Sequence, residues 1–184
     1  MLTRSLPGAA AGSAVWLATL AVASLGLAGC ASTTGETTAS ARLEPTRGNS
    51  ARGMVRFVQH GDMVRVSGTV SGLRAGAEHG FHVHEKGDCS SGDGNSAGGH
   101  FNPAGVPHGQ HGSGQHHAGD LPNLRADGDG VATFNFVSRS IRIGDGATDI
   151  VGRGLIVHAN PDDYITQPTG NAGARLACAV IAGR

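Results

Sequence analysis

The sequence has few aromatic residues, one lysine and no hydrophobic run of membrane-spanning length. Aromatic residues make up 4% of its 184 residues. Fourteen basic residues balance fourteen acidic ones, so the charge gives no indication of a nucleic-acid or acidic-polymer partner. No segment keeps a helical period over three turns, which counts against a helical fold.

The longest apolar stretch, residues 14–28, is too short and too rich in small side chains to span a membrane. It follows Arg4 and ends at Leu27-Ala28-Gly29-Cys30, so we predict an export signal over residues 1–29. These four residues resemble the lipobox of bacterial lipoproteins, although a leader cut without lipid is an alternative. The resemblance implies a protein of the periplasm or cell envelope that is anchored in the membrane only through a lipid on Cys30. Ala31 is not the aspartate associated with inner-membrane retention, so we expect the outer membrane.

Three cysteines are an awkward number for an exported protein. If Cys30 carries lipid, Cys89 and Cys178 remain as a pair in an oxidising compartment. A bridge between them would close a loop of about 90 residues, for which chain entropy gives on the order of 4–5 kcal/mol of stabilisation.

The composition of residues 30–40, mostly Ser, Thr, Ala and Gly, predicts a flexible tether, and we place the folded domain at 41–184. Short alternating runs lie between turn residues there. We expect strands over these ranges: 54–59, 63–70, 81–84, 123–126, 131–136, 150–158 and 175–181. The pattern predicts an all-β fold, a Greek-key sandwich or flattened barrel of about eight antiparallel strands.

A His-x-His pair, His82 and His84, lies on one of these predicted strands. Alternate residues of a strand lie on one face about 6.5 Å apart, so both rings can bind one metal ion while Phe81 and Val83 enter the core. Two long loops, 89–121 and 159–174, follow His84 and His158, and loops of this length are more often functional than idle.

The first long loop carries three further imidazoles and a carboxylate in a set suited to tetrahedral zinc: His100, His108, His117 and Asp120. His111 and His116 lie in the same loop, and spacing alone does not exclude them. His82, His84 and His158 would form a second, all-imidazole site, which favours copper. His100 could join the two ions through both ring nitrogens.

Two segments, Gly80–Ser90 and Gly170–Cys178, resemble the motifs of the copper/zinc superoxide dismutases, and the resemblance extends over residues 41–184. It implies that two superoxide anions are converted to O2 and peroxide by alternating reduction and oxidation of copper. The copper ligands it implies are His82, His84, His100 and His158. The zinc ligands it implies are His100, His108, His117 and Asp120.

The same resemblance implies roles for residues outside the two ligand sets. Cys89 and Cys178 match the family's disulfide, Arg175 matches the guanidinium that holds the anion beside copper, and Asp162 matches a carboxylate that links one ligand of each metal. His100, as the bridging ligand, would carry a proton during turnover.

The loop 159–174 departs from the family's eukaryotic members because it is short and has no lysine. We expect Lys86, the only lysine, to attract the anion instead. A non-enzymatic copper or zinc carrier of the envelope is the main alternative function, and a metal-binding relative without turnover is a third. The sequence leaves open whether the chain is a monomer or a homodimer, and what His60 and His79 do.

Overall fold

The structure is a computed structural model that describes residues 1–3, 8 and 36–184. In this part of the chain we find ten strands, one 3-10 turn (η1, Asn95–Ala97) and no α-helix. The strands are β1 (Thr38–Pro45), β2 (Arg52–His60), β3 (Met63–Ser71), β4 (Glu78–His79), β5 (Phe81–His84), β6 (Leu124–Arg125), β7 (Ala132–Ser138), β8 (Gly154–His158), β9 (Arg175–Val180) and β10 (Ala182–Gly183).

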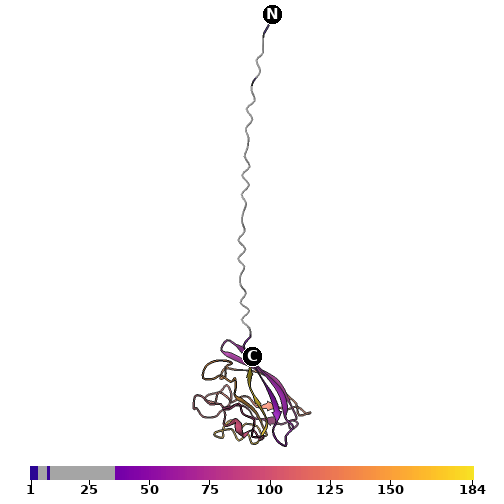
Figure 1. Cartoon of the computed structure of the whole chain (residues 1–184), viewed down its shortest axis with the longest axis vertical. Coiled ribbons are helices and arrows are strands. Elements are labelled where there is room, and N and C mark those ends of the chain that lie inside the picture. Colours follow the sequence, from indigo (N-terminus) through magenta and orange to yellow (C-terminus); the bar gives the residue numbers. More distant parts are fainter. Residues whose placement is uncertain (4–7, 9–35) are drawn as a thin grey trace. The chain divides into compact units, whose positions relative to one another are not determined.

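Eight of the strands form one curled antiparallel sheet (Figure 1). Its order is β5-β8-β9-β1-β2-β3-β7, with β10 added beside β1, and β4 pairs separately with β6. The prediction of an all-β fold is confirmed. The structure has ten strands where about eight were expected, and two of them, β4 and β10, are two-residue strands that the sequence did not predict.

Along the strands of this sheet, side chains that point into the core alternate with side chains that point to solvent. In β3, Val64, Val66 and Val70 are fully buried, whereas Arg65 between them is exposed. β2 pairs with β3 through all nine residues of both strands, as the predicted hairpin requires. The inward-facing residues of these strands belong to one hydrophobic core that also includes Phe57, Phe81 and Leu155.

The first strand was not expected from the sequence. β1 begins at Thr38, three residues before the predicted domain boundary, because Ala39, Ala41 and Leu43 all point into the core. Residues 38–40 share the small-residue composition of a tether, but they pair with β2 in register. The predicted strand 150–158 is also shorter than expected, since β8 begins only at Gly154.

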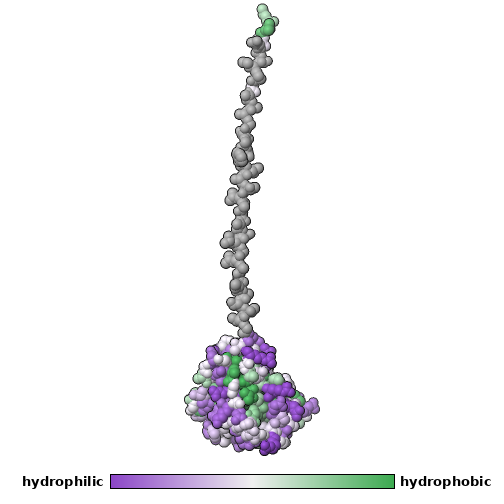
Figure 2. Space-filling view, viewed as in Figure 1, coloured by the Kyte–Doolittle hydropathy of each residue, from purple (hydrophilic) through white to green (hydrophobic). Residues whose placement is uncertain are grey.

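The predicted export signal and Cys30 lie outside the described residues, apart from residues 1–3 and 8. Within the described residues, no helix is long and apolar enough to cross a membrane. On the face seen in Figure 2, hydrophobic residues form small patches among hydrophilic ones. The large exposed apolar side chains of the folded part come from separate elements: Met54, Val137, Ile165 and Val180.

Cys89 and Cys178 form a disulfide across 89 residues of sequence. It ties the beginning of the first long loop to β9, where Cys178 packs with Ala97 and Ile156 in a small second hydrophobic cluster. The loop and the strand therefore move together.

We predict that the double variant Cys89→Ser/Cys178→Ser has a free energy of unfolding about 2–5 kcal/mol lower than the parent, because its unfolded chain gains the freedom of a long open loop. Urea unfolding of the two metal-free proteins measures this. The parent in the presence of a reductant is the control and should match the variant. An unchanged unfolding midpoint would contradict the prediction.

Candidate metal centre

Three histidines come together on the outer face of two neighbouring strands. β5 and β8 pair so that His82 lies opposite Ile156, which places His158, two residues further along, on the same face as His82 and His84. Phe81 and Val83 point the other way into the core with no exposed surface, as the sequence predicted. His82 and His84 are also fully buried, because the long loops cover them.

The first long loop lies back against β5 as an irregular extra strand. Val83 accepts a hydrogen bond from Phe101 N and donates one to the carbonyl of Gly119, and isolated bridges pair His84 with His100. Gly119 permits this approach because a Cβ there would lie 2.2 Å from the Val83 oxygen. The potential metal ligands of this loop therefore lie beside those of β5.

The first group of potential ligands consists of His82, His84, His100 and His158, whose ring nitrogens lie within 4.8 Å of one another. Three of the rings are oriented by a hydrogen bond at the nitrogen that faces away from the group. His82 Nε2 bonds Asp162, His84 Nδ1 bonds the Gly98 carbonyl, and His158 Nδ1 bonds the Gly173 carbonyl. The other nitrogen of each ring faces the group: His84 Nε2 and His158 Nε2 lie 3.4 Å apart, and His82 Nδ1 has no partner among the described residues.

The second group consists of His100, His108, His117 and Asp120, again with ligand atoms within 4.8 Å. Asp120 lies 2.8 Å from His100 Nδ1, 3.0 Å from His108 Nδ1 and 3.4 Å from His117 Nδ1. Backbone N–H groups of Gly109 and His117 donate to its Oδ2. The carboxylate is therefore held in one orientation among the three rings.

Four buried nitrogens in the two groups have no hydrogen-bond partner in the part of the chain that the structure describes: His82 Nδ1, His100 Nε2, His108 Nδ1 and His117 Nδ1. A buried polar atom without a partner costs on the order of 1–3 kcal/mol. His108 Nδ1 is close to Asp120 but not in hydrogen-bonding geometry. Atoms that converge on a shared ion have this arrangement, so the residues fit metal ions at both groups.

The donor sets match two different metals. Three imidazoles and one carboxylate, all buried, suit tetrahedral zinc. Four imidazole nitrogens suit copper. His100 belongs to both groups, with Nδ1 beside Asp120 in the second and Nε2 left for the first. The two groups thus share the ring of His100, and its bridging of two ions stays a prediction.

Burial sets the protonation of the first group. It lowers the pKa of His82 to about 4, against the opposing effect of the hydrogen bond that His82 Nε2 donates to Asp162, and it lowers the pKa of His84 and His158 well below the usual value. These rings are neutral near pH 7, so their lone pairs are available. Neutral imidazole is the form that binds metal.

In the second group burial and carboxylates act in opposite directions, and burial prevails at His117, whose pKa it lowers. Burial disfavours a charged His108, but the carboxylates of Asp120 and Asp162 outweigh burial and raise its pKa to about 9. Burial alone would raise the pKa of both carboxyls, whereas their histidine partners hold it well below the usual range. Both acids are therefore ionised, as ligands and acceptors near cations must be.

Asp162 connects the two groups from the second long loop. Its Oδ2 accepts from His82 Nε2 at 2.8 Å and its Oδ1 accepts from His108 Nε2 at 2.9 Å. Gly170 lies against it, with a φ of +66° and no room for a Cβ beside the carboxylate. Gln167 bonds both the N–H and the carbonyl of His108. The loop thus fixes a ligand of each group at once.

Arg175, the first residue of β9, lies over the first group. Its Nη1 donates to the Gly94 carbonyl at 2.7 Å and its Nη2 to the Gly98 carbonyl at 2.6 Å. The Gly98 carbonyl also accepts from His84 Nδ1, so the guanidinium and a ligand ring share one acceptor. Burial lowers the pKa of Arg175 from its usual range, and the guanidinium stays charged.

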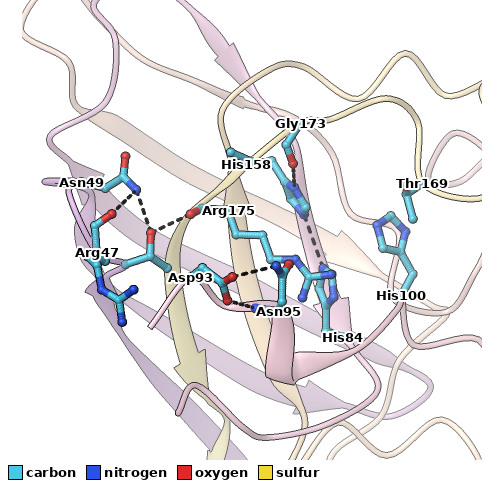
Figure 3. A pocket seen from close by; sticks show the side chains of 12 residues that line it. Arg47, Asn49, His84, Asp93, Asn95, His100, His158, Thr169, Gly173 and Arg175 are labelled. Atoms are coloured by element: carbon cyan, nitrogen blue, oxygen red, sulfur yellow. Dashed lines mark hydrogen bonds between the residues drawn. The ribbon is translucent and has the colours of Figure 1, made fainter. Parts of the chain in front are cut away.

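The first group opens to solvent and the second does not. A cavity of about 390 Å³ is lined by His84, His100, His158 and Arg175 together with residues of the β1–β2 connection (Figure 3). His108, His117 and Asp120 are at most 5% exposed and do not line it. A redox ion in the first group would be reachable, whereas an ion in the second would be enclosed.

Several residues near the site were not assigned from the sequence. His79 in β4 is buried and bonds the backbone carbonyl of His158 through Nδ1, which fixes the position of that ligand. His111 and His116 lie outside both groups, half-buried, and bond backbone carbonyls of the loop. His60 is exposed at the end of β2. Spacing alone left His111 and His116 open as ligands, and the three-dimensional arrangement places them outside both groups.

Lys86 is exposed and is not among the residues that line the cavity. The described cavity instead contains Arg47, which follows Thr46 in the β1–β2 connection. The steering role that we expected of Lys86 therefore stays a prediction, without support from its position.

Known proteins resemble this chain in sequence and structure. The family described as "Copper/zinc superoxide dismutase (SODC)" matches residues 51–181, a range that includes every residue of both groups as well as Arg175. The chain is 44% identical over 136 residues to "Superoxide dismutase [Cu-Zn]" of Paramecium bursaria Chlorella virus 1, covering 71% of this chain and 72% of that protein.

A solved structure described as "Crystal Structure Analysis of the clock protein EA4" superimposes with a TM-score of 0.73 at 38% identity, covering 81% of this chain and 96% of that one. The folds agree, and the matched sequence includes both ligand groups. The chain belongs to the copper/zinc superoxide dismutase family.

Proposed function

We propose that this chain dismutates superoxide at the cavity above His84, His100 and His158, converting two superoxide anions and two protons into O2 and hydrogen peroxide. The observation that carries the proposal is the shared ring of His100, which lies between an accessible all-imidazole group and an enclosed group containing a carboxylate. Copper bound to the first group supplies a one-electron redox couple, and zinc bound to the second supplies a fixed positive charge.

The protein residues bind the anion and supply a proton. The Arg175 guanidinium, fixed by the carbonyls of Gly94 and Gly98, faces a cavity that contains three of the ligand rings and orients a small anion there. His100 Nε2 is the atom at which a proton can be held for the peroxide product, while His100 Nδ1 stays on the enclosed side. His82, His84 and His158 keep their orientation through hydrogen bonds outside the ligand group.

A carrier is the less favoured function. Every member of the two ligand groups is at most 6% exposed, and each is held by the fold or by a hydrogen bond. A carrier needs ligands that exchange readily. The match to a named superoxide dismutase also supports the enzyme.

We further propose that the protein acts in the cell envelope, anchored through a lipid on Cys30. We propose the outer rather than the inner membrane as the site of this anchor. Support comes from the sequence Leu27-Ala28-Gly29-Cys30 at the end of the apolar stretch and from Ala31 after it. An envelope location also agrees with the disulfide.

We predict that Arg175→Gln lowers the second-order rate constant for superoxide by roughly ten-fold, because the anion loses its fixed cation. Arg175→Lys should recover part of the rate. Pulse radiolysis of proteins with equal copper content measures this. A glutamine variant as fast as the parent would exclude Arg175 from the reaction.

We predict that Asp162→Asn weakens zinc and copper binding by about 10- to 100-fold, because an amide offers one acceptor where two imidazole N–H groups require two. Metal competition against a chelator, read by elemental analysis, measures the affinities. Asp163→Asn is the matched control, since the side chain of Asp163 bonds only Ile165 and Thr166 of its own turn. Equal affinities for both variants would show that Asp162 does not orient the ligands.

We predict that Cys30→Ser moves the protein from the membrane fraction to the soluble fraction of a bacterial host and abolishes incorporation of labelled fatty acid. The activity of the folded domain should be unchanged, because the domain begins after this residue. A serine variant that still sediments with membranes would contradict the lipid anchor.

A further inference from the structure

The cavity above the first ligand group contains a second guanidinium besides that of Arg175. Arg47, in the connection between β1 and β2, lines the same cavity as His84 and His100. Figure 3 places Arg47 at one end of the lining residues and His100 at the other, with the Arg175 side chain between them. Arg47 is exposed, Arg175 is partly buried and the rings are buried, so the two cations lie along a path inward from solvent.

We propose that Arg47 is a positioning residue for the anion: it attracts superoxide to the mouth of the cavity, from which the anion reaches Arg175. The inference rests on the proposed function, because it assumes that a small anion is the substrate. It adds a residue outside both long loops to the anion path.

The backbone around Arg47 is tied to the same segments that hold Arg175. Arg47 N donates to the Gly92 carbonyl at 2.7 Å. Thr46 Oγ1 donates to the Arg175 carbonyl at 2.6 Å, and Asn49 Nδ2 donates to Thr46 Oγ1 at 2.8 Å. This network fixes the base of the Arg47 side chain relative to the inner guanidinium.

The guanidinium itself lies over a backbone without a side chain. A Cβ at Gly92 would lie 2.8 Å from Arg47 Nη2, so Arg47 occupies the space that a side chain there would take. Among the described residues, no acidic oxygen lies within 4.0 Å of Arg47. Its charge is therefore not neutralised by an ion pair and acts on the cavity and the solvent in front of it.

Arg47 changes the net charge of the cavity lining. Asp93 is the one carboxylate among the described residues that line the cavity, and it is oriented by Asn95 through two hydrogen bonds. The loop 159–174 contributes Asp162 and Asp163 but no lysine or arginine. With Arg47 the cavity lining carries two guanidinium groups against one carboxylate, whereas without it the charges would cancel.

The test compares Arg47→Gln with Arg65→Gln, which removes the same charge from an exposed position on β3 outside the cavity lining. At low ionic strength, the second-order rate constant of Arg47→Gln should be about two- to five-fold below that of the parent, and Arg47→Glu should be lower still. The difference between the two rate constants should shrink as the ionic strength rises and the Debye length falls to about 10 Å. Arg65→Gln should follow the parent.

Equal salt profiles for Arg47→Gln and Arg65→Gln would overturn the proposal. So would a lower rate that persists at all ionic strengths together with a lower metal content, since that pattern indicates a structural role. Lys86→Gln is measured in the same series. An effect of Lys86→Gln without one of Arg47→Gln would assign the attraction to Lys86 and overturn the proposal for Arg47.

A second measurement separates this inference from the proposed function. Azide, a small monovalent anion, is titrated into the copper-loaded proteins and followed by absorbance, which needs no turnover. Arg47→Gln should bind azide about two- to five-fold more weakly than Arg65→Gln at low salt. If the parent protein binds azide but does not dismutate superoxide, the proposed enzymatic function is refuted. The effect of Arg47 on anion binding is still measured by the azide affinities. Equal azide affinities would refute the role of Arg47.

Discussion

The site depends on one imidazole with ligand atoms on two sides. His100 has its ring centroid 3.9 Å from that of His82 in the first group and 5.4 Å from that of His108 in the second. The protein buries this ring together with nitrogens that find no partner among the described residues, an arrangement that costs free energy unless ions are bound. Metal binding therefore stabilises the fold as well as supplying the chemistry.

The rest of the structure keeps these buried atoms in place by tying loops to strands. The disulfide holds the beginning of the first loop against β9. A few residues later the same loop presents the Gly98 carbonyl, which accepts from both Arg175 and His84. From the opposite side, Asp162 bonds one ring of each group. A change in either loop would therefore reach both the anion site and the metal ligands.

The distribution of charge explains how one accessible site can be selective. Burial keeps the rings of His82, His84 and His158 neutral, so the positive charge that an anion meets there comes from guanidinium groups and from the ions themselves. Arg175 is fixed by two carbonyls, whereas Arg47 lies further out. The enclosed group has its own carboxylate, which balances part of the charge there. The cavity thus admits a small anion to one metal position only.

Much of this could be predicted from the sequence because it depends on local patterns. Alternation of apolar residues predicted the hairpin of β2 and β3, and the His-x-His spacing placed two rings on one face of β5. The strand β1 was missed because its inward residues include small alanines, whose burial depends on pairing with β2. The sequence by itself determined which residue types could bind two metals. Only the tertiary structure decided how the six candidate ligand histidines converge in two buried groups and that Arg47 rather than Lys86 lines the cavity, since both depend on contacts between segments far apart in the chain.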